Sequence, residues 1–289
     1  MDVLIYHGSD CNDGFCCAFL AKLAYPNVTC IPANYGDPPP IVTGLVVVIA
    51  DFSYPRDVLL QMKQEAKSLL VFDHHKTAEK NCKGLDFCTF DMGECGASLL
   101  LRWLSWDWPW EFVGYIKDRD LWLKRNQFIE EFHVWLSAVP KTFEDWTKAL
   151  KEFTEELNNP VPSWVDKGRF LLSAFRGEIV LAKARGWRQV VGGVEVPVVN
   201  NTQKSITSDL LHEMAVGEPF AASFYHQDKG LILWSLRSTE DGMDVSEIAR
   251  MYGGGGHKHA AGFKEYQYPL QMPGGVKLTA SAAAPALLG

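Results

Sequence analysis

Three short apolar runs near the start of the chain each end in Asp or His, and this pattern constrains the fold more than any other feature. The runs cover residues 2–6, 45–50 and 69–72. Apolar runs of this length are typical of strands buried in a parallel sheet. The residues that follow them are His7, Asp51 and the triplet Asp73-His74-His75. Because the carboxyl ends of parallel strands share one sheet edge, where ligands bind in open α/β folds, the pattern predicts a ligand site there.

The order of apolar segments predicts the fold class. Strands alternate with helices in the first 73 residues, which is the βαβ rhythm of an α/β protein. We therefore expect an N-terminal, mostly parallel, doubly wound sheet with helices on both faces. The strands are expected at 2–7, 28–33, 45–50 and 69–73. The helices are expected at about 14–25, 55–67, 95–106 and 110–120, in a Trp-rich region to about 157, and at 163–186. Residues 76–92 show no clear period and are predicted to form a surface loop over the site.

The pattern changes after residue 187 to that of a smaller α+β domain with hairpins. Strands at 188–191 and 194–199 flank Gly192-Gly193, a strong hairpin signal. The further elements are a helix at 205–215, strands at 219–226 and 230–236, and a helix at 244–251. The predicted domains are a catalytic metal-binding domain at 1–160, a linker helix at 161–186, a substrate-binding domain at 187–266 and a disordered tail at 267–289.

Composition limits the partners of the chain. The net charge is −7, from 35 acidic and 28 basic residues, so attraction to a long nucleic-acid backbone is not expected. The seven cysteines include no Cys-x-x-Cys pair and indicate reduced thiols in the cytoplasm. A zinc site at Cys82, Cys88 and Cys95 is disfavoured because their spacing fits no usual knuckle. We see no signal peptide or membrane-spanning run and expect no membrane partner.

The acidic and imidazole groups indicate a site for divalent Mn, Mg, Fe or Zn rather than a thiolate site. The turn after the first strand carries His7, Asp10 and Asp13. In the alternative interpretation, Asp13 is a helix cap and Asp10 forms a turn. Asp51 is the natural bridging ligand between two ions, although it also suits a cap.

Further along the chain, His74 is predicted to be a ligand, and Asp73 is expected to hold an imidazole. His75 is predicted to contact a substrate phosphate or to act as an acid. Asp118 could complete the second ion site, with Asp120 outside it. From spacing alone, the choice between these two carboxylates stays open.

The second domain contains an unusual run of four glycines, at 253–256, before His257. Glycines allow backbone amides to approach a phosphate or a base closely, although glycine runs are more often linkers. Arg237, which ends a predicted strand, could fork onto a phosphate, or form a surface salt bridge. The predicted substrate-binding residues are Arg237, Gly254, Gly255, Gly256 and His257.

Together these positions resemble the DHH phosphoesterase family with its DHH-associated C-terminal domain. The resemblance rests on the turn at 7–14, Asp51, the triplet at 73–75, the stretch 118–120 and the glycine motif at 254–263. It implies two lobes with a cleft and a two-manganese centre, with Mg²⁺ or Co²⁺ as alternatives to Mn²⁺. The implied metal ligands are His7, Asp10, Asp13, Asp51, His74 and Asp118. The residues predicted to be catalytic are Asp51 and His75.

The resemblance predicts a cytoplasmic Mn-dependent phosphodiesterase or phosphatase. Its expected substrates are short oligonucleotides, as for an oligoribonuclease or exonuclease, linear or cyclic dinucleotides, or nucleoside bisphosphates, cleaved by a water that two metal ions activate. The alternatives are an inorganic pyrophosphatase or polyphosphatase, and a nucleotide-binding sensor without catalysis. A homodimer is left open.

Overall fold

The computed structural model describes residues 1–8, 11–107 and 109–266 of the chain. The chain splits into two compact units, with the boundary between Ala174 and Phe175. None of the described helices has the length and apolar content needed to cross a membrane.

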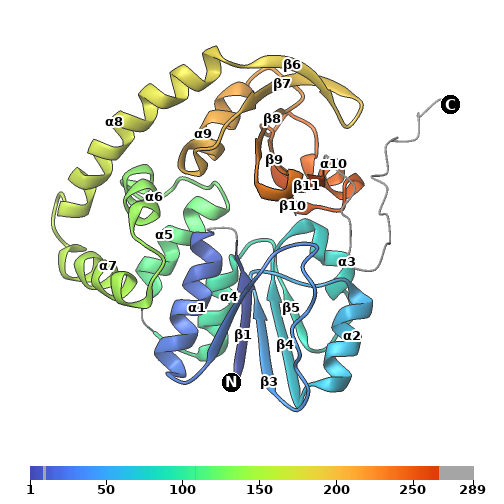
Figure 1. The fold of residues 1–289 in the computed structure, drawn as a ribbon. Coiled ribbons are helices and arrows are strands. Elements are labelled where there is room, and N and C mark those ends of the chain that lie inside the picture. The colour runs from blue at the N-terminus through green and yellow to red at the C-terminus, as the bar shows by residue number, and fades with distance from the viewer. Residues whose placement is uncertain (9–10, 108, 267–289) are drawn as a thin grey trace. The chain divides into compact units, whose positions relative to one another are not determined.

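The first unit is built on a five-stranded sheet in which every pair of neighbouring strands is parallel (Figure 1). The strand order is β2-β1-β3-β4-β5. The strands are β1 (Val3–His7), β2 (Thr29–Ala33), β3 (Val46–Ala50), β4 (Ser68–Asp73) and β5 (Cys88–Phe90). The predicted α/β class and parallel sheet are confirmed.

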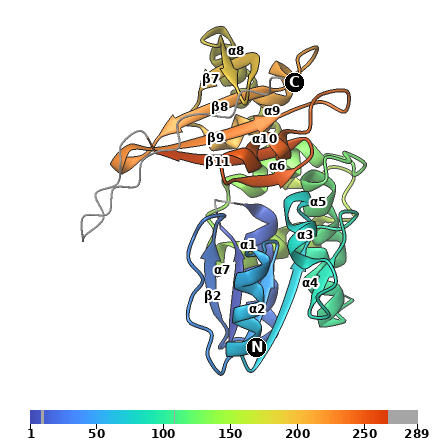
Figure 2. The ribbon, with the colours of Figure 1, turned by 90° about the vertical axis from the view of Figure 1, so that its right-hand side faces the viewer.

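Alternate residues of β1, β3 and β4 enter two separate hydrophobic cores. Leu4 of β1 faces the core formed by α1 (Asn12–Ala24), α4 (Gly96–Leu104), α5 (Trp110–Asp120), α6 (Ile129–Ala138) and α7 (Phe143–Glu156). Its neighbours Val3 and Ile5 face the second core, with α2 (Arg56–Glu65) and α3 (Glu79–Cys82). Figure 2 shows α2 on the near side of this sheet. Because strand side chains alternate between faces, one apolar run supplies both cores.

The predicted loop at 76–92 is wrong in part. It contains a 3₁₀ turn (Lys76–Ala78), α3 and the edge strand β5, which pairs with β4. The strand β5 has only three residues, too few for a hydrophobic period to show. It adopts the strand conformation through its pairing with β4.

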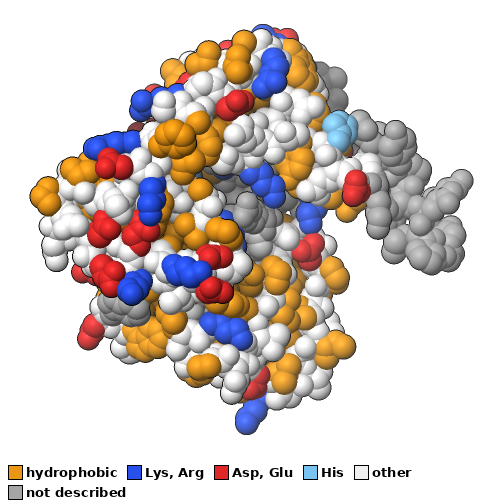
Figure 3. Space-filling view, turned by 60° about the vertical axis from the view of Figure 1, so that its left-hand side comes forward, with side chains coloured by type: hydrophobic (Ala, Val, Ile, Leu, Met, Phe, Trp, Pro, Cys, Tyr) orange, Lys and Arg blue, Asp and Glu red, His pale blue; other side chains and the backbone are white. Residues whose placement is uncertain are grey.

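The helical part of the first unit presents charges of both signs to solvent. Lys148 of α7 pairs with Glu144 at 2.7 Å, and Lys167 of α8 (Ser163–Ala184) pairs with Glu152 at 2.7 Å. Figure 3 shows acidic and basic side chains interspersed on this side of the molecule. Exposed pairs of this kind contribute only about 0–1 kcal/mol each, so the helices depend on their buried faces.

The second unit contains a six-stranded mixed sheet in the order β10-β11-β9-β8-β7-β6. Only β7 and β8 are parallel neighbours. The strands are β6 (Trp187–Val191), β7 (Val194–Asn200), β8 (Ala221–His226), β9 (Leu231–Arg237), β10 (Gly255–His257) and β11 (Ala260–Tyr266). Two separate cores hold α9 (Lys204–Met214) and α10 (Val245–Met251) against it.

The hairpin predicted at Gly192-Gly193 is confirmed, with β6 and β7 antiparallel and both glycines at positive φ. A second hairpin joins β8 to β9 through the 3₁₀ turn Asp228–Gly230. The strands β10 and β11 were not predicted, because the glycine run at 253–256 and the small residues at 260–262 carry no hydrophobic period. The tail expected to be disordered, 267–289, lies outside the described residues.

Two glycines of α8 give a matched test of packing. A Cβ on Gly168 would lie 2.3 Å from the carbonyl oxygen of Glu131 on α6, whereas a Cβ on Gly177 would meet nothing within 4 Å. We expect Gly168→Ala to lower the free energy of unfolding by about 1–3 kcal/mol, because the overpacked helices must move apart. Gly177→Ala should instead raise it by about 0.5–1 kcal/mol through helix propensity. Urea unfolding of both variants would show opposite shifts; shifts of the same sign would contradict this packing.

Candidate metal centre

Four side chains from four elements meet at the carboxyl edge of the first sheet. His74 follows β4 and is fully buried, and its Nε2 atom lies 2.9 Å from Asp51 Oδ1, 3.7 Å from Asp13 Oδ2 and 3.6 Å from Asp120 Oδ2. His74 therefore lies at the centre of three carboxylates.

Asp51 is held in place by the backbone as well as by its imidazole neighbours. It follows β3 in the left-handed conformation, at φ 59°, and is 1% exposed. A Cβ on Gly96, at the start of α4, would lie 2.3 Å from the Cβ of Asp51. Only glycine at position 96 allows the helix to approach Asp51 this closely.

Asp13 lies in the first turn of α1 but binds a different helix. Its two carboxylate oxygens accept hydrogen bonds from the backbone N–H groups of Gly96 (2.6 Å) and Ala97 (2.9 Å) at the N-terminus of α4. The alternative interpretation of Asp13 as the cap of its own helix is wrong, because Cys11 is the N-cap of α1; Asp13 binds the start of α4 instead and lies beside His74. A helix N-terminus favours a carboxylate through its unpaired N–H groups and its dipole.

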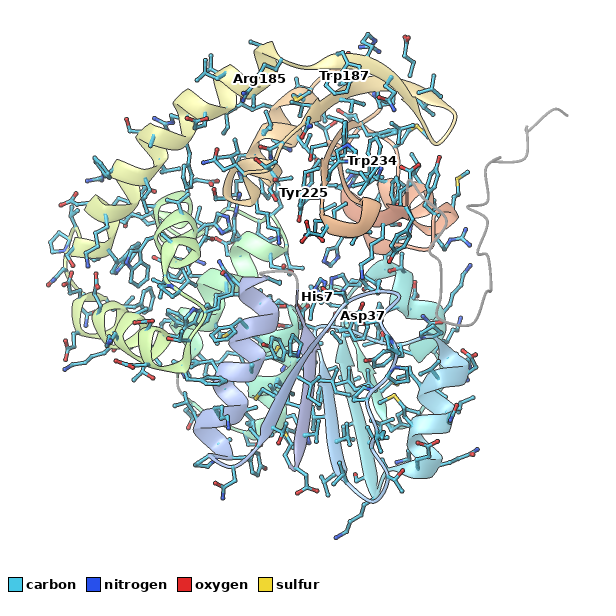
Figure 4. The ribbon with its side chains drawn as sticks, viewed as in Figure 1. His7, Asp37, Arg185, Trp187, Tyr225 and Trp234 are labelled. Carbon is cyan, nitrogen blue, oxygen red and sulfur yellow. The ribbon has the colours of Figure 1, made fainter. Side chains whose placement is uncertain are left out.

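The second group of the edge is formed by His7, Asp51 and His75. His7 lies at the carboxyl end of β1 (Figure 4), with its Nδ1 atom 3.5 Å from Asp51 Oδ2. His75 Nδ1 lies 2.8 Å from Asp73 Oδ1. The carboxylate of Asp73 also accepts hydrogen bonds from the backbone N–H groups of His74 and His75 and from the hydroxyl of Ser53. Asp73 thus orients an imidazole, as its predicted role requires.

Burial and mutual repulsion change the protonation of these groups. Burial and the carboxylates of Asp51 and Asp120 raise the pKa of Asp13 well above its usual value. Burial also raises the pKa of Asp120; His74 opposes this shift and Asp51 adds to it. For Asp51 burial acts in the same direction, but its contacts with the imidazoles of His7 and His74 outweigh it and hold its pKa well below 3.8. Three neighbouring acids with these opposed shifts form a site where positive charge is stabilising.

Asp120, and not Asp118, belongs to this cluster. The carboxylate of Asp118 accepts hydrogen bonds from the backbone N–H groups of Arg125 and Asn126, at 2.7–3.0 Å, and so holds the turn after α5. The Oδ2 atom of Asp120 is buried and has no hydrogen-bond partner among the described residues. Two residues apart on a helix of 3.6 residues per turn, the two side chains point to nearly opposite sides. Only the packing of α5 could show which side faces the sheet.

The ligand sets of the first unit fit divalent cations. Asp13, Asp51 and His74 form one group and His7, Asp51 and His75 form another, each with ligand atoms within 4.8 Å of one another. Neither group contains a cysteine. The orphaned oxygen of Asp120 and the repulsion between the acids are what a bound cation would relieve. Asp10, a predicted ligand, lies outside the described residues, and the ligand roles of the other residues stay predictions.

The predicted substrate residues of the second unit have packing roles. A Cβ on Gly254 would lie 2.1 Å from the carbonyl oxygen of Gly262, and one on Gly256 would lie 2.4 Å from that of Ala260. Gly255, Gly256 and His257 pair with β11 as strand β10. Close strand pairing therefore explains the glycine run without a ligand, and its contact with substrate stays a prediction. Arg237 ends β9 and donates to the hydroxyl of Ser208, at 2.9 Å.

Comparison with known proteins supports the interpretation of the second unit. Residues 194–274 match the family model of the DHHA1 domain, which confirms the resemblance over that stretch. Protein R106 of Acanthamoeba polyphaga mimivirus, described as uncharacterized, is 26% identical over 288 residues, covering 91% of this chain and 67% of that protein.

Two solved structures are similar at low identity. The pGpG-specific phosphodiesterase PggH of Vibrio cholerae is 14% identical, with 92% of this chain and 94% of that chain covered and a TM-score of 0.41. An exopolyphosphatase-related protein from Bacteroides fragilis is 13% identical, with 93% and 88% covered and a TM-score of 0.43.

Substitutions of Asp120 and Asp118 form a matched pair, since each removes one carboxylate from α5. Asp120→Asn should raise the melting temperature of the chelator-treated protein, because it removes one of three repelling carboxylates, and should reduce the rise that added Mn²⁺ produces. Asp118→Ala should lower stability by about 1–3 kcal/mol with or without metal, since two backbone N–H groups lose their acceptor. Differential scanning calorimetry with and without Mn²⁺ separates the two. A full metal response in Asp120→Asn would contradict the placement of Asp120 at the centre.

The metal-free protein should lose stability as the pH rises. A group whose pKa is raised by folding stabilises the folded state below its ordinary pKa, and this contribution is lost as the pH passes the raised value. Burial lowers the pKa of His74, but the neighbouring acids outweigh it and raise the pKa from 6.5 to about 9, a change worth about 3 kcal/mol across that window. Asp13 and Asp120 act in the same direction above 3.8. Unfolding midpoints in chelator should fall between pH 6 and 9, and less steeply in His74→Gln; equal slopes would refute the assignment.

Proposed function

We propose that this protein is a metal-dependent phosphoesterase of the DHH type that hydrolyses small nucleotides. The observation that carries the proposal is that two groups of ligand-capable side chains, buried except for the partly exposed His7, share the carboxylate of Asp51. A carboxylate shared between two ligand sets is the arrangement that two-metal hydrolases use. The DHHA1 match in residues 194–274 supports a phosphoesterase over an unrelated metal protein.

The chain's residues would hold two divalent ions with distinct sets of donors. Asp13, His74 and Asp120 would hold one ion, His7 and His75 would lie on the side of the other, and Asp51 would serve both. Divalent ions at such sites supply Lewis-acid stabilisation of phosphoryl oxygens and lower the pKa of a water molecule. Mn²⁺ suits this mixture of imidazole and carboxylate donors, with Mg²⁺ and Co²⁺ as alternatives.

The surrounding residues fix the donors in place. Asp73 Oδ1 accepts from His75 Nδ1 and thereby sets the tautomer of the imidazole, so that its Nε2 atom carries the lone pair. The N–H groups of α4 hold Asp13, and the close contact between Gly96 and Asp51 fixes the position of the shared carboxylate. Because these groups are already in position, the site does not have to rearrange when charge develops on the phosphoryl group.

The expected substrates are short oligonucleotides, linear or cyclic dinucleotides and nucleoside bisphosphates. An inorganic pyrophosphatase or polyphosphatase would use the same metal design. A panel of pApA, cyclic dinucleotides, pAp, pyrophosphate and polyphosphate, assayed with Mn²⁺, Mg²⁺ and Co²⁺, separates these activities. A DHH-type nucleotide hydrolase requires turnover of at least one nucleotide and its loss in chelator.

Asp51→Asn tests the shared carboxylate directly. Asn tolerates the left-handed backbone that Asp51 adopts, so the fold should be retained, while one charged donor is lost from both groups. Because even the outer partners of metal ligands contribute about 10–100-fold, we expect activity to fall by at least about 100-fold. Initial rates at saturating metal measure the effect, and circular dichroism controls for folding. Activity close to that of the parent would end the two-metal proposal.

A further inference from the structure

The imidazole of His75 has two carboxylates within reach of the same nitrogen. Its Nδ1 atom lies 2.8 Å from Asp73 Oδ1 and 3.9 Å from Asp51 Oδ1. Asp51 belongs to both ligand groups, so a hydrogen bond from His75 to its carboxylate would compete with a cation for the same oxygen. Whatever keeps Asp73 in its present position therefore also keeps Asp51 available, even if it touches no metal ligand itself.

The carboxylate of Asp73 is held at both oxygens. Its Oδ1 atom accepts the backbone N–H groups of His74 (2.7 Å) and His75 (3.1 Å) in addition to the imidazole of His75. Its Oδ2 atom accepts the hydroxyl of Ser53, which lies between β3 and α2. Three N–H donors on one oxygen favour the ionised carboxyl, which can only accept hydrogen bonds. Ser53 is therefore the donor that fixes the second oxygen.

The hydroxyl of Ser53 is in turn oriented by a thiol. Cys82, the last residue of α3, donates its S–H group to Ser53 Oγ at 3.7 Å. A hydroxyl hydrogen rotates to suit its partners, so a donor on the oxygen leaves that hydrogen directed at the carboxylate. Arg56, at the start of α2, donates to the backbone carbonyl groups of Asn81 (3.2 Å) and Lys83 (2.7 Å). These two residues flank Cys82, so the thiol is anchored to the segment that carries Ser53.

Burial makes these contacts hard to replace. Ser53, Asp73 and Cys82 are each at most 3% exposed. Bulk water does not reach this part of the site, so a carboxylate oxygen that loses its donor stays unsatisfied or turns toward another donor. Movement of Asp73 would leave the Nδ1–H group of His75 with Asp51 as the other carboxylate in reach.

Resting on the proposed phosphoesterase function, we propose that Ser53 is a positioning residue of the metal centre. Acting through Asp73, it keeps the Nδ1–H group of His75 directed away from Asp51, and Cys82 supports it by orienting its hydroxyl. The shared carboxylate of Asp51 then stays available to cations, and the Nε2 atom of His75 keeps its lone pair.

The first test observes His75 directly, in chelator-treated protein labelled with ¹⁵N-histidine. The NMR signals of His75, assigned by their loss in His75→Phe, should show a proton on Nδ1 that exchanges slowly with water. Ser53→Ala should speed this exchange about tenfold, because the carboxylate that accepts the proton loses a donor of its own. The backbone N–H of Val71 in the same strand should exchange as before. An unchanged Nδ1–H signal in Ser53→Ala would overturn the proposal.

The thiol gives a graded version of the same measurement. Cys82→Ala should speed the exchange in the same direction but less, and Cys82→Ser, which keeps a donor, should restore the slow exchange of the parent. Cys30→Ala is the matched control, because the Cys30 thiol donates to the carbonyl of Ala18 at 3.8 Å and has no contact with Ser53. Equal exchange in Cys82→Ala and Cys82→Ser would refute the role of the thiol.

The second test is a double-mutant cycle on the affinity for Co²⁺, measured by calorimetric titration. Ser53→Ala should weaken Co²⁺ binding about tenfold, at the lower end of what partners of metal ligands contribute. In a His75→Phe background the same substitution should change the affinity less than about twofold, because no Nδ1–H group remains to be directed. A residue with a merely structural role would cost the same in both backgrounds, and that result would refute the proposal.

The outcomes separate this role from the proposed function. If the parent binds Co²⁺ but hydrolyses no member of the substrate panel, the phosphoesterase function fails, and the cycle still decides the role of Ser53. If the parent binds no Co²⁺, the function fails as well, and the exchange of the His75 proton decides. If the panel is hydrolysed while Ser53→Ala keeps the parent's proton exchange and Co²⁺ affinity, the function stands and the positioning role fails.

Discussion

Three carboxylates converge at the carboxyl edge of the first sheet, and the rest of the site depends on how their repulsion is offset. His74 lies within 3.7 Å of all three, and the N–H groups at the start of α4 hold one of them, Asp13. These contacts keep Asp51 charged, but the pKa values of Asp13 and Asp120 stay raised. Without a metal these two carboxyl groups therefore favour their protonated forms, and divalent cations would take the place of those protons.

The fold brings these groups together through close backbone contacts rather than long side chains. The missing Cβ of Gly96 lets α4 reach Asp51, and the same helix start binds Asp13 from α1. A parallel sheet supplies the remaining donors, because successive strands end at the same edge. This edge also adjoins a depression lined by His7 and Lys141.

Much of the fold could be predicted from the sequence, because long periodic segments carry their own signal. The helix expected at 110–120 is α5 at the same residues, and the hairpin at Gly192-Gly193 follows from the need for positive φ. Short or side-chain-poor strands could not be predicted. The strand β5 has three residues, and β10 contains two glycines, so both depend on pairing with a neighbouring strand rather than on a pattern of their own.

The sequence by itself determined that Asp and His residues end the strands of a parallel sheet, since apolar runs bounded by polar residues leave few other arrangements. The shared position of His7, Asp51 and His74 at one edge of the sheet could also be predicted from the sequence, because it depends only on the order and direction of the strands. Only the tertiary structure showed that Asp120 rather than Asp118 lies beside His74, since the rotation of α5 about its axis depends on packing against the sheet. It alone brought Lys141, more than 130 residues from His7 in the chain, to the same depression, because contacts between distant segments leave no local signal.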